Sequence, residues 1–187
     1  MAPVDIAFLT LGIIAAVINV LSYQIKQQRY YLFFQMIMAT ILVIQYGIIG
    51  AWAGMILNII SATRALAFYA NKHERVGRIV LGTIFSLLNL AAVIVVCVCF
   101  KEYWYMGLVI GVAQIVGTIA MATGSNRIVK IAQMFIVSPC WLSYAAFYTA
   151  IGHPNYGGIV MEACNILSII IFFIRLKYVE SKKDEVN

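Results

Sequence analysis

Long apolar runs alternate with short polar connections along almost the whole chain. A helix needs about 20 mainly apolar residues, at about 1.5 Å rise each, to cross a membrane. Runs such as LNLAAVIVVCVCF are apolar on successive residues, whereas the strands of a β-barrel alternate. The pattern predicts an all-α polytopic membrane protein with seven transmembrane helices, at about residues 5–23, 31–49, 51–70, 79–100, 105–123, 131–151 and 158–174.

Composition excludes a soluble domain. Hydrophobic residues make up 64% of the chain and charged residues 11%, and the mean hydropathy of +0.95 lies far outside the soluble range. The first apolar run follows Asp5 rather than a basic stretch and has no small-residue cleavage site. We therefore expect no cleaved signal peptide, so that the first span remains in the mature protein.

Lysine and arginine residues predict the orientation. Loops one, three and five and the C-terminal tail share one side of a seven-span protein, and the other side holds only Lys101. Cytoplasmic loops are the ones enriched in these residues, so we predict the N-terminus outside and the C-terminus in the cytoplasm. The net charge of +6 then faces the lipid bilayer and its anionic headgroups, without nucleic acid as a partner. The residues on the basic side are Lys26, Arg29, Lys72, Arg75, Arg78, Arg127, Lys130, Arg175, Lys177, Lys182 and Lys183.

The chain contains an internal repeat. Residues 29–46 align without a gap with residues 127–144, and NIIS at 58–61 aligns with NILS at 165–168. An odd number of spans between the copies keeps them in the same orientation. The repeat predicts two parallel three-helix bundles joined by a linker helix (3+1+3). The predicted parts are residues 1–70 for the first bundle, 71–104 for the linker, 105–175 for the second bundle and 176–187 for a cytoplasmic tail.

These stretches resemble a known family. LGIIAAVINVLSYQIKQQRYYLFFQ followed by GAWAGMILNIISATRALAFY is similar to the bacterial inner-membrane proteins of the YgjV family. The 3+1+3 plan, with an Asn on the third helix of each half, looks like the SWEET and PQ-loop (MtN3-like) transporter group. The resemblance covers most of residues 8–176 and implies a multi-pass protein of the bacterial inner (plasma) membrane. It implies that Asn58 and Asn165 face each other across a central substrate pocket.

The chain also departs from that group. At the position of the Pro-Gln pair, SYQI keeps Gln24 but has Tyr23 in place of proline, and the second half has AMATG. The paired tryptophans that cover a SWEET sugar are absent, since Trp141 aligns with Val43. The resemblance therefore implies neither hinging at paired prolines nor a sugar substrate.

Two matched polar stripes are the candidate substrate-binding residues. Asn58 and Asn165 each lie about seven residues, or about 10 Å, into a helix that enters from outside. Ser61 and Ser168 follow one turn further on the same faces. One interpretation is interhelical hydrogen bonding, a common role of Asn and Ser in membranes. The other is a pocket lining, in which amides suit a polar neutral or zwitterionic solute.

Two intramembrane charges are candidates for gating or coupling. Arg64 lies about 20 Å into its span, where it either reaches the cytoplasmic headgroups, closes an inner gate or contacts an anionic solute. Glu162 lies one turn outside Asn165 on the same face and either faces outer-side water or couples transport to a proton or cation.

Two repeated pairs complete the gating candidates. Gln35 and Gln133 lie one turn inside the cytoplasmic end of their spans, where they either pair as an inner gate or pack between helices. Tyr46 and Tyr144 either supply an aromatic surface to the pocket or anchor their spans at the membrane interface.

Motifs of catalysis are missing from the sequence. It has no GxSxG, HExxH, P-loop or dinucleotide fingerprint, and its four cysteines form no CxxC. We therefore predict no enzyme, no catalytic residue, no metal and no cofactor. The predicted function is transport of a small-molecule solute by alternating access, as a monomer or homodimer. The alternative is a non-transporting seven-helix membrane protein with a structural, sorting or receptor role.

Overall fold

The computed structural model describes residues 3–48, 50–71, 74–99, 104–151 and 155–184. Within these ranges all regular structure is helical. The elements are α1 (Pro3–Gln24), α2 (Gln28–Ile48), α3 (Trp52–Ala70), α4 (Arg75–Cys99), α5 (Trp104–Ala122), α6 (Asn126–Ala132), the π-helix η1 (Gln133–Val137), α7 (Ser138–Ala150) and α8 (Tyr156–Asp184).

Six helical segments in the described ranges are long and apolar enough to cross a membrane, and α1 adds a shorter apolar stretch, Thr10–Gln24. For this part of the chain, the prediction of seven apolar helices is confirmed. One crossing segment, Asn126–Ala150, combines α6, η1 and α7, and we refer to it as the sixth span. The largest difference in bounds is at α8, which continues as helix to Asp184, through most of the predicted tail.

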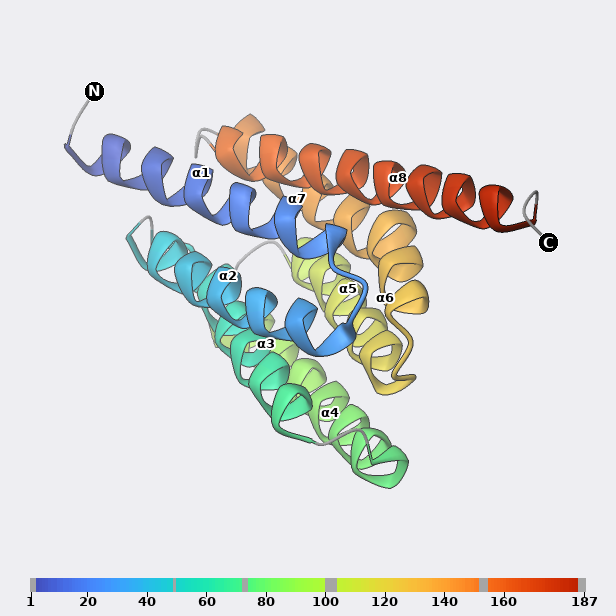
Figure 1. Ribbon diagram of the computed structural model, residues 1–187. Coiled ribbons are helices and arrows are strands. Elements are labelled where there is room, and N and C mark those ends of the chain that lie inside the picture. Colours follow the sequence, from blue (N-terminus) through green and yellow to red (C-terminus); the bar gives the residue numbers. More distant parts are fainter. Residues whose placement is uncertain (1–2, 49, 72–73, 100–103, 152–154, 185–187) are drawn as a thin grey trace.

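Six of the seven helical segments form a closed ring of contacts. Figure 1 shows α1 beside α8, and α2 beside α3. α1 packs on α2 and α8, α2 packs on α3, and α3 packs on α5. The sixth span packs on both α5 and α8, which completes the ring. α4 lies outside the ring, against α3 and α5. The first and last helices of the chain are therefore neighbours.

Many polar residues are buried inside the bundle, and its exterior is apolar, unlike that of a soluble protein. Asn19, Asn89 and Asn165 are at most 1% exposed. Large apolar side chains point outward instead, with exposed fractions of 74% for Val76 and 61% for Leu87 on α4. Such an exterior suits hydrocarbon, and buried polar groups facing the inside of a helical bundle are typical of membrane proteins.

Glycine in a left-handed conformation allows two of the tight connections. Gly50, between α2 and α3, has a φ of 69°, and Gly124, between α5 and α6, has a φ of 75°. Glycine adopts these angles without a Cβ penalty and commonly follows a helix end. After Gly124, the Ser125 hydroxyl accepts a hydrogen bond from Ile128 N at 3.4 Å, which caps α6. The neighbouring spans can therefore follow one another closely.

The π-helix in the sixth span has a local cause. Pro139 has no backbone N–H and its ring crowds the carbonyl four residues earlier, so a regular α-helix is disfavoured there. The widened turn lies immediately upstream, where Ser138 N–H donates to Gln133 O, five residues back. The sequence places Pro139 inside a span but gives no direct signal for the type of distortion. The π-helix faces the interior of the ring, where Gln133 and Val137 reach a cavity.

Two apolar clusters lie toward opposite ends of the ring. The first holds Ala53 and Leu57 of α3, with Ile110 of α5 and aromatic residues of α7. The second holds Phe68 of α3 and Met121 of α5, together with Tyr23, Tyr31, Leu32, Ala120, Val129 and Ile169. Several buried polar side chains lie between the two clusters, in what we call the polar layer.

We predict that Gly111→Ala destabilises the protein. A Cβ at residue 111 would lie 2.5 Å from Cγ2 of the buried Val93, so α4 and α5 would have to separate. Overpacking of this kind costs about 1–3 kcal/mol. The midpoint of thermal unfolding in detergent should fall. Gly157→Ala is the control, because its nearest neighbour would be Gln45 Nε2 at 3.9 Å, and an equal fall in both variants would contradict the prediction.

Candidate functional site

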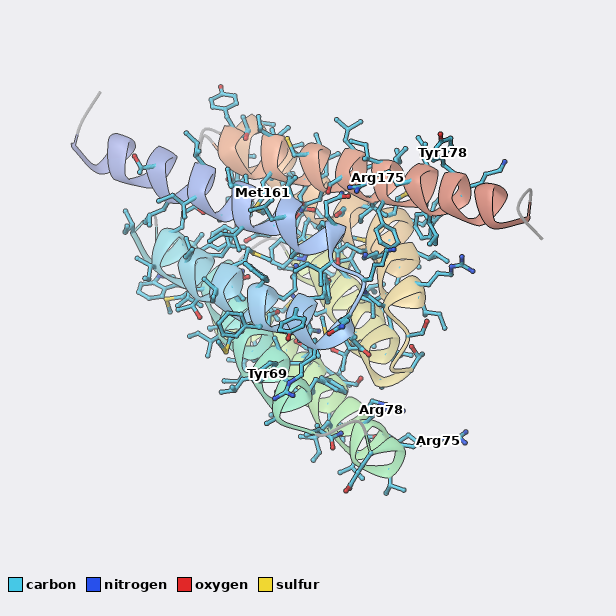
Figure 2. The ribbon with its side chains drawn as sticks, in the orientation of Figure 1. Tyr69, Arg75, Arg78, Met161, Arg175 and Tyr178 are labelled. Carbon is cyan, nitrogen blue, oxygen red and sulfur yellow. The ribbon has the colours of Figure 1, made fainter. Side chains whose placement is uncertain are left out.

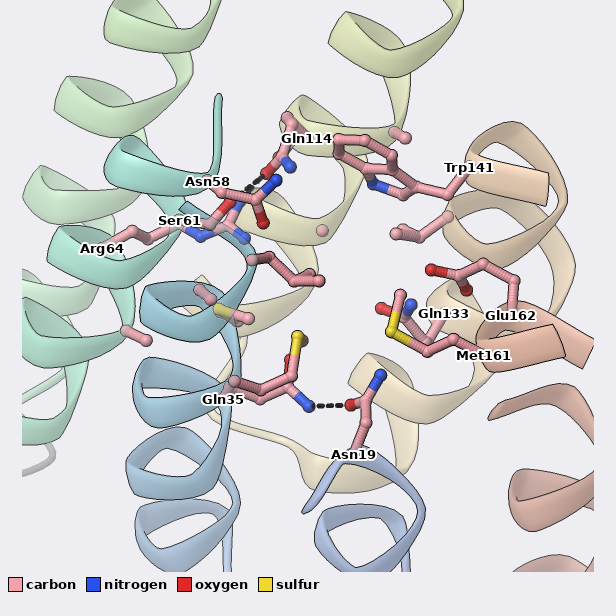
Figure 3. A pocket seen from close by; sticks show the side chains of 18 of the residues that line it. Asn19, Gln35, Asn58, Ser61, Arg64, Gln114, Gln133, Trp141, Met161 and Glu162 are labelled. Atoms are coloured by element: carbon pink, nitrogen blue, oxygen red, sulfur yellow. Dashed lines mark hydrogen bonds between the residues drawn. The ribbon is translucent and has the colours of Figure 1, made fainter. Parts of the chain in front are cut away.

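A cavity of about 60 Å³, called the central cavity below, lies in the polar layer between the two clusters (Figure 3). It has room for a few water molecules, since each needs roughly 10–15 Å³ of space for its centre. Apolar and aromatic side chains such as Met38, Leu42 and Trp141 form part of the wall. The polar lining is Asn19 of α1, Gln35 of α2, Asn58, Ser61 and Arg64 of α3, Gln114 of α5, Gln133 of η1 and Glu162 of α8.

Arg64 joins α3 to α5. Its Nη1 donates to Gln114 O at 2.9 Å and to Thr118 Oγ1 at 2.6 Å, and the residue is 6% exposed. The side chain therefore turns into the bundle rather than toward the headgroups. Its Nε is buried without a hydrogen-bond partner. The guanidinium thus places a positive charge with spare hydrogen-bonding capacity at the wall of the cavity.

Ser61 and Asn58 occupy the same wall in different ways. The Ser61 hydroxyl lies 2.8 Å from Gln114 Oε1 and 2.9 Å from Leu57 O, so it reaches both α5 and its own helix. Asn58 Nδ2 donates to Gly54 O on its own helix at 2.7 Å. Ser61 therefore serves packing between helices as well as the cavity, whereas the hydrogen bond of Asn58 links no two helices.

Glu162 lies on the opposite wall of the cavity, and the structure connects it to the π-helix. Its Oε2 accepts from Asn165 Nδ2 at 3.0 Å, and the Ser138 hydroxyl lies beside the same carboxyl group. Ser138 Oγ in turn accepts from Gln133 Nε2 at 3.1 Å. Glu162 is 5% exposed, and no ion pair joins it to Arg64 in the described ranges.

Asn165 and Ser168 lie outside the lining of the central cavity, unlike their repeat mates. Asn165 is fully buried and donates to Glu162. The Ser168 hydroxyl donates to Val20 O at 2.9 Å and accepts from Gln24 Nε2 at 2.8 Å, which ties α8 to α1. α8 therefore presents Glu162, the turn before Asn165, to the cavity. The substrate-binding role predicted for these two residues has no cavity contact to support it.

The two members of each repeated pair, Gln35 with Gln133 and Tyr46 with Tyr144, also differ in their contacts. Gln35 and Gln133 both line the cavity, but Gln35 donates to Asn19 Oδ1 at 2.7 Å and Gln133 donates to Ser138, so they do not bond to each other. Tyr46 lines the cavity and stacks on Trp141 at 6.4 Å between ring centroids. Tyr144 lies outside the lining and packs 4.6 Å from Tyr148.

Several site residues were missed from the sequence. Gln114 is a polar residue within an apolar span, a signal that could have identified it. Asn19 has no repeat mate and Trp141 aligns with Val43. The repeat predicts site residues only where both halves match, so it indicates neither of them. No group of three or more His, Cys, Asp or Glu side chains that could hold a metal ion is found in the described ranges.

Hydrogen bonds hold the connection between α1 and α2 against α6. Ile25 O accepts from Lys130 Nζ and from Asn126 Nδ2, each at 2.8 Å, and Lys26 O accepts from Asn126 Nδ2 at 2.9 Å. Lys130 is fully buried, with its Nζ 3.1 Å from the centroid of the Phe172 ring. A residue counted among the loop charges in the sequence is therefore part of a seal, which we call the Lys130 seal.

We predict that Thr118→Val lowers stability because it removes the hydroxyl that accepts from Arg64 Nη1 and, at 3.3 Å, from Asn89 Nδ2. Bonds of this kind contribute about 1–2 kcal/mol. The thermal unfolding midpoint should fall clearly below that of Thr83→Val, whose exposed hydroxyl bonds only to Ile79 O of its own helix. Equal midpoints would show that the contacts of the Thr118 hydroxyl contribute nothing to stability.

Comparison with known proteins identifies one match. A family model described as a bacterial inner membrane protein, Imp-YgjV, matches residues 7–180. No curated protein and no solved structure matches the chain. The match covers most of the chain, and together with the apolar helices it indicates a multi-pass protein of the bacterial inner membrane.

Proposed function

We propose that the chain, which belongs to the Imp-YgjV family of bacterial inner membrane proteins, transports a small polar neutral or zwitterionic solute by alternating access. The central cavity carries this proposal. It lies inside a ring of spans, and two of its polar side chains, Asn58 and Gln133, bond only within their own span and so are not needed to join helices. Binding sites of secondary transporters lie near the middle of the membrane between structural repeats.

The order of packing around the ring supports a 3+1+3 transporter plan. The repeat relates α1, α2 and α3 to α5, the sixth span and α8. Under this relation each neighbouring pair has a counterpart: α1 and α2 correspond to α5 and the sixth span, and the contact of α3 with α5 corresponds to that of α8 with α1. A pseudo-twofold axis along the membrane normal fits this pattern, with α4 as the linker, the N-terminus outside and the C-terminus in the cytoplasm.

The lining favours a solute that carries both donors and acceptors. Arg64 and Glu162 place opposite charges on opposite walls, and Gln35, Gln114 and Gln133 add amides between them. A single bare ion would satisfy only one of the two charged walls, whereas a zwitterion or a neutral polar molecule suits both. Glu162 is the residue proposed for coupling to a proton or cation, because an acidic group inside a membrane bundle is costly without a function.

The two ends of the cavity suit different gates. At the cytoplasmic end, as the orientation is proposed, the Lys130 seal joins the α1–α2 connection to α6 through hydrogen bonds. At the outer end, Tyr46 and Trp141 meet through their rings. We assign the inner gate to the Lys130 seal, with Gln35 and Gln133 at its cavity side. Because both halves are present, one chain suffices for transport, as a monomer or within a homodimer.

Transport is tested by flux through proteoliposomes that contain the purified full-length protein. A thermal-shift screen against sugars, amino acids, vitamins and nucleosides selects the solutes, and uptake of the labelled solute is compared with that of empty liposomes. Saturable uptake is expected for at least one class. No protein-dependent movement of any solute in the panel would overturn the proposal and leave the structural, sorting or receptor alternative.

We predict that Asn58→Leu abolishes solute binding but not folding. Asn58 lines the cavity, and its bond goes to its own helix, so its loss removes no interhelical contact. Solute uptake should fall by about tenfold or more, while expression and the gel-filtration profile stay unchanged. Ser143→Ala, which removes an exposed hydroxyl bonded to Pro139 O, should transport normally. Loss of folding in Asn58→Leu would favour a packing role for the residue.

We predict that Lys130→Met opens the inner seal. The ammonium group supplies a charge-assisted bond to Ile25 O and a cation–π contact with Phe172, and a thioether replaces neither. Amide hydrogen exchange in the connection between α1 and α2 should become roughly tenfold faster or more, as measured by mass spectrometry. Lys177→Met, on the exposed face of α8, should leave this exchange unchanged, and unchanged exchange in Lys130→Met would contradict the assignment.

A further inference from the structure

A second cavity, of about 70 Å³, lies between the end of α1 and α8, and it is separate from the central cavity in its lining. Gln24, Lys26, Phe172, Arg175 and Leu176 line it. Arg175 lies on the part of α8 that passes the end of α1 (Figure 2). We call this space the α1–α8 crevice. Its residues do not contribute to the proposed solute site.

The rim of the crevice is positive, and no carboxylate among the described side chains pairs with its two charges. Lys26 and Arg175 are both exposed, and neither forms an ion pair in the described ranges. Arg175 Nη1 has a long contact of 3.4 Å with Gln24 Oε1, which is a neutral acceptor. The Lys130 ammonium lies on the Phe172 ring, so a third positive charge stands close to the wall. These groups together attract an anion.

The floor of the crevice is apolar. Phe172 is 9% exposed and Leu176 is half-buried, and exposed aliphatic residues such as Ile174 continue along α8. The crevice also lies where α8 changes from apolar residues to the basic, polar sequence RLKYVESKKD. That change marks the depth of the headgroups in a membrane helix, where basic pockets between spans bind phosphate-bearing lipid heads.

We propose that the α1–α8 crevice binds a phosphate group between Lys26 and Arg175, carried either by the headgroup of an anionic phospholipid or by free phosphate. The guanidinium offers two parallel donors to phosphate oxygens, and the ammonium offers a point charge beside them. Gln24 Nε2 is already bonded to Ser168, which holds this side chain in place at the wall. A volume of about 70 Å³ admits one phosphate group in place of a few waters.

A phosphate bound in the crevice would join the connection between α1 and α2 to α8, the last helix of the chain. Lys26 belongs to the connection between α1 and α2, and Arg175 belongs to α8. The carbonyl of the preceding residue, Ile25, accepts the bond of the Lys130 seal. An anion that bridges Lys26 and Arg175 therefore holds the same connection in place from its outer side.

The test uses purified full-length protein in a non-ionic detergent. Phosphatidylglycerol and phosphatidylcholine with matched acyl chains are titrated separately, and retained lipid is counted by native mass spectrometry. Inorganic phosphate forms the third arm, in which it competes with phosphatidylglycerol and is scored alone by thermal shift. The variants are Lys26→Gln with Arg175→Gln, and a control with Arg75→Gln and Lys177→Gln, which removes two exposed charges outside the crevice.

Phosphatidylglycerol should bind more tightly than phosphatidylcholine, and its affinity should fall about fivefold for each crevice charge removed. The control variant should bind like the wild type. Thermal stabilisation by inorganic phosphate that is lost in the crevice variant, without retention of either lipid, would assign the same site to the free ion. Equal retention of phosphatidylglycerol in the crevice variant and the wild type, with no response to phosphate, would overturn the proposal. If the double variant fails to fold, Lys26→Gln alone carries the same test, because Lys26 lies in an exposed connection.

Discussion

The hydrocarbon of a membrane offers no hydrogen-bond partners, so polar groups inside the bundle must bond to the protein or face an enclosed polar space. This constraint accounts for the way the helices meet. Arg64 reaches the backbone of α5, Ser168 reaches the backbone of α1, and Lys130 reaches Ile25 O. Each of these contacts joins segments far apart in sequence. The apolar exterior gives the ring no preferred order of helices, so the polar contacts within it specify which helices are neighbours.

Two regions of the bundle are held by different kinds of contact. Hydrogen bonds from Asn126 and Lys130 fix the connection between α1 and α2. Ring contacts of Tyr46, Trp141 and Tyr144 join α2 to α7. Hydrogen bonds require defined positions of donor and acceptor, whereas ring contacts tolerate small shifts in angle. The bundle is therefore held more strictly in the hydrogen-bonded region, although the two halves of the sequence are similar.

The spans were predictable because their length and apolar character are set by the thickness of the membrane, a constraint that acts on each segment alone. Asn58 and Ser61 were predictable for the same reason, as polar residues that interrupt an apolar run. The repeat then suggested the same surroundings for Asn165 and Ser168. The contacts of these two residues depend on how α8 packs against α1, and the sequence of α8 alone does not determine that packing. Lys130 was taken for a loop charge because it precedes the predicted span at residues 131–151, and the carbonyl of Ile25 and the ring of Phe172 explain its burial.

The π-helix gives the sixth span one residue more than a regular helix would need over the same length. An α-helix turns by about 100° per residue, so a return of residues 133–137 to α geometry would rotate the rest of the span by about that angle. Such a rotation would carry Trp141 away from Tyr46 and would move Ser138 away from Glu162. The additional residue of the π-helix therefore determines which face of α7 points into the bundle.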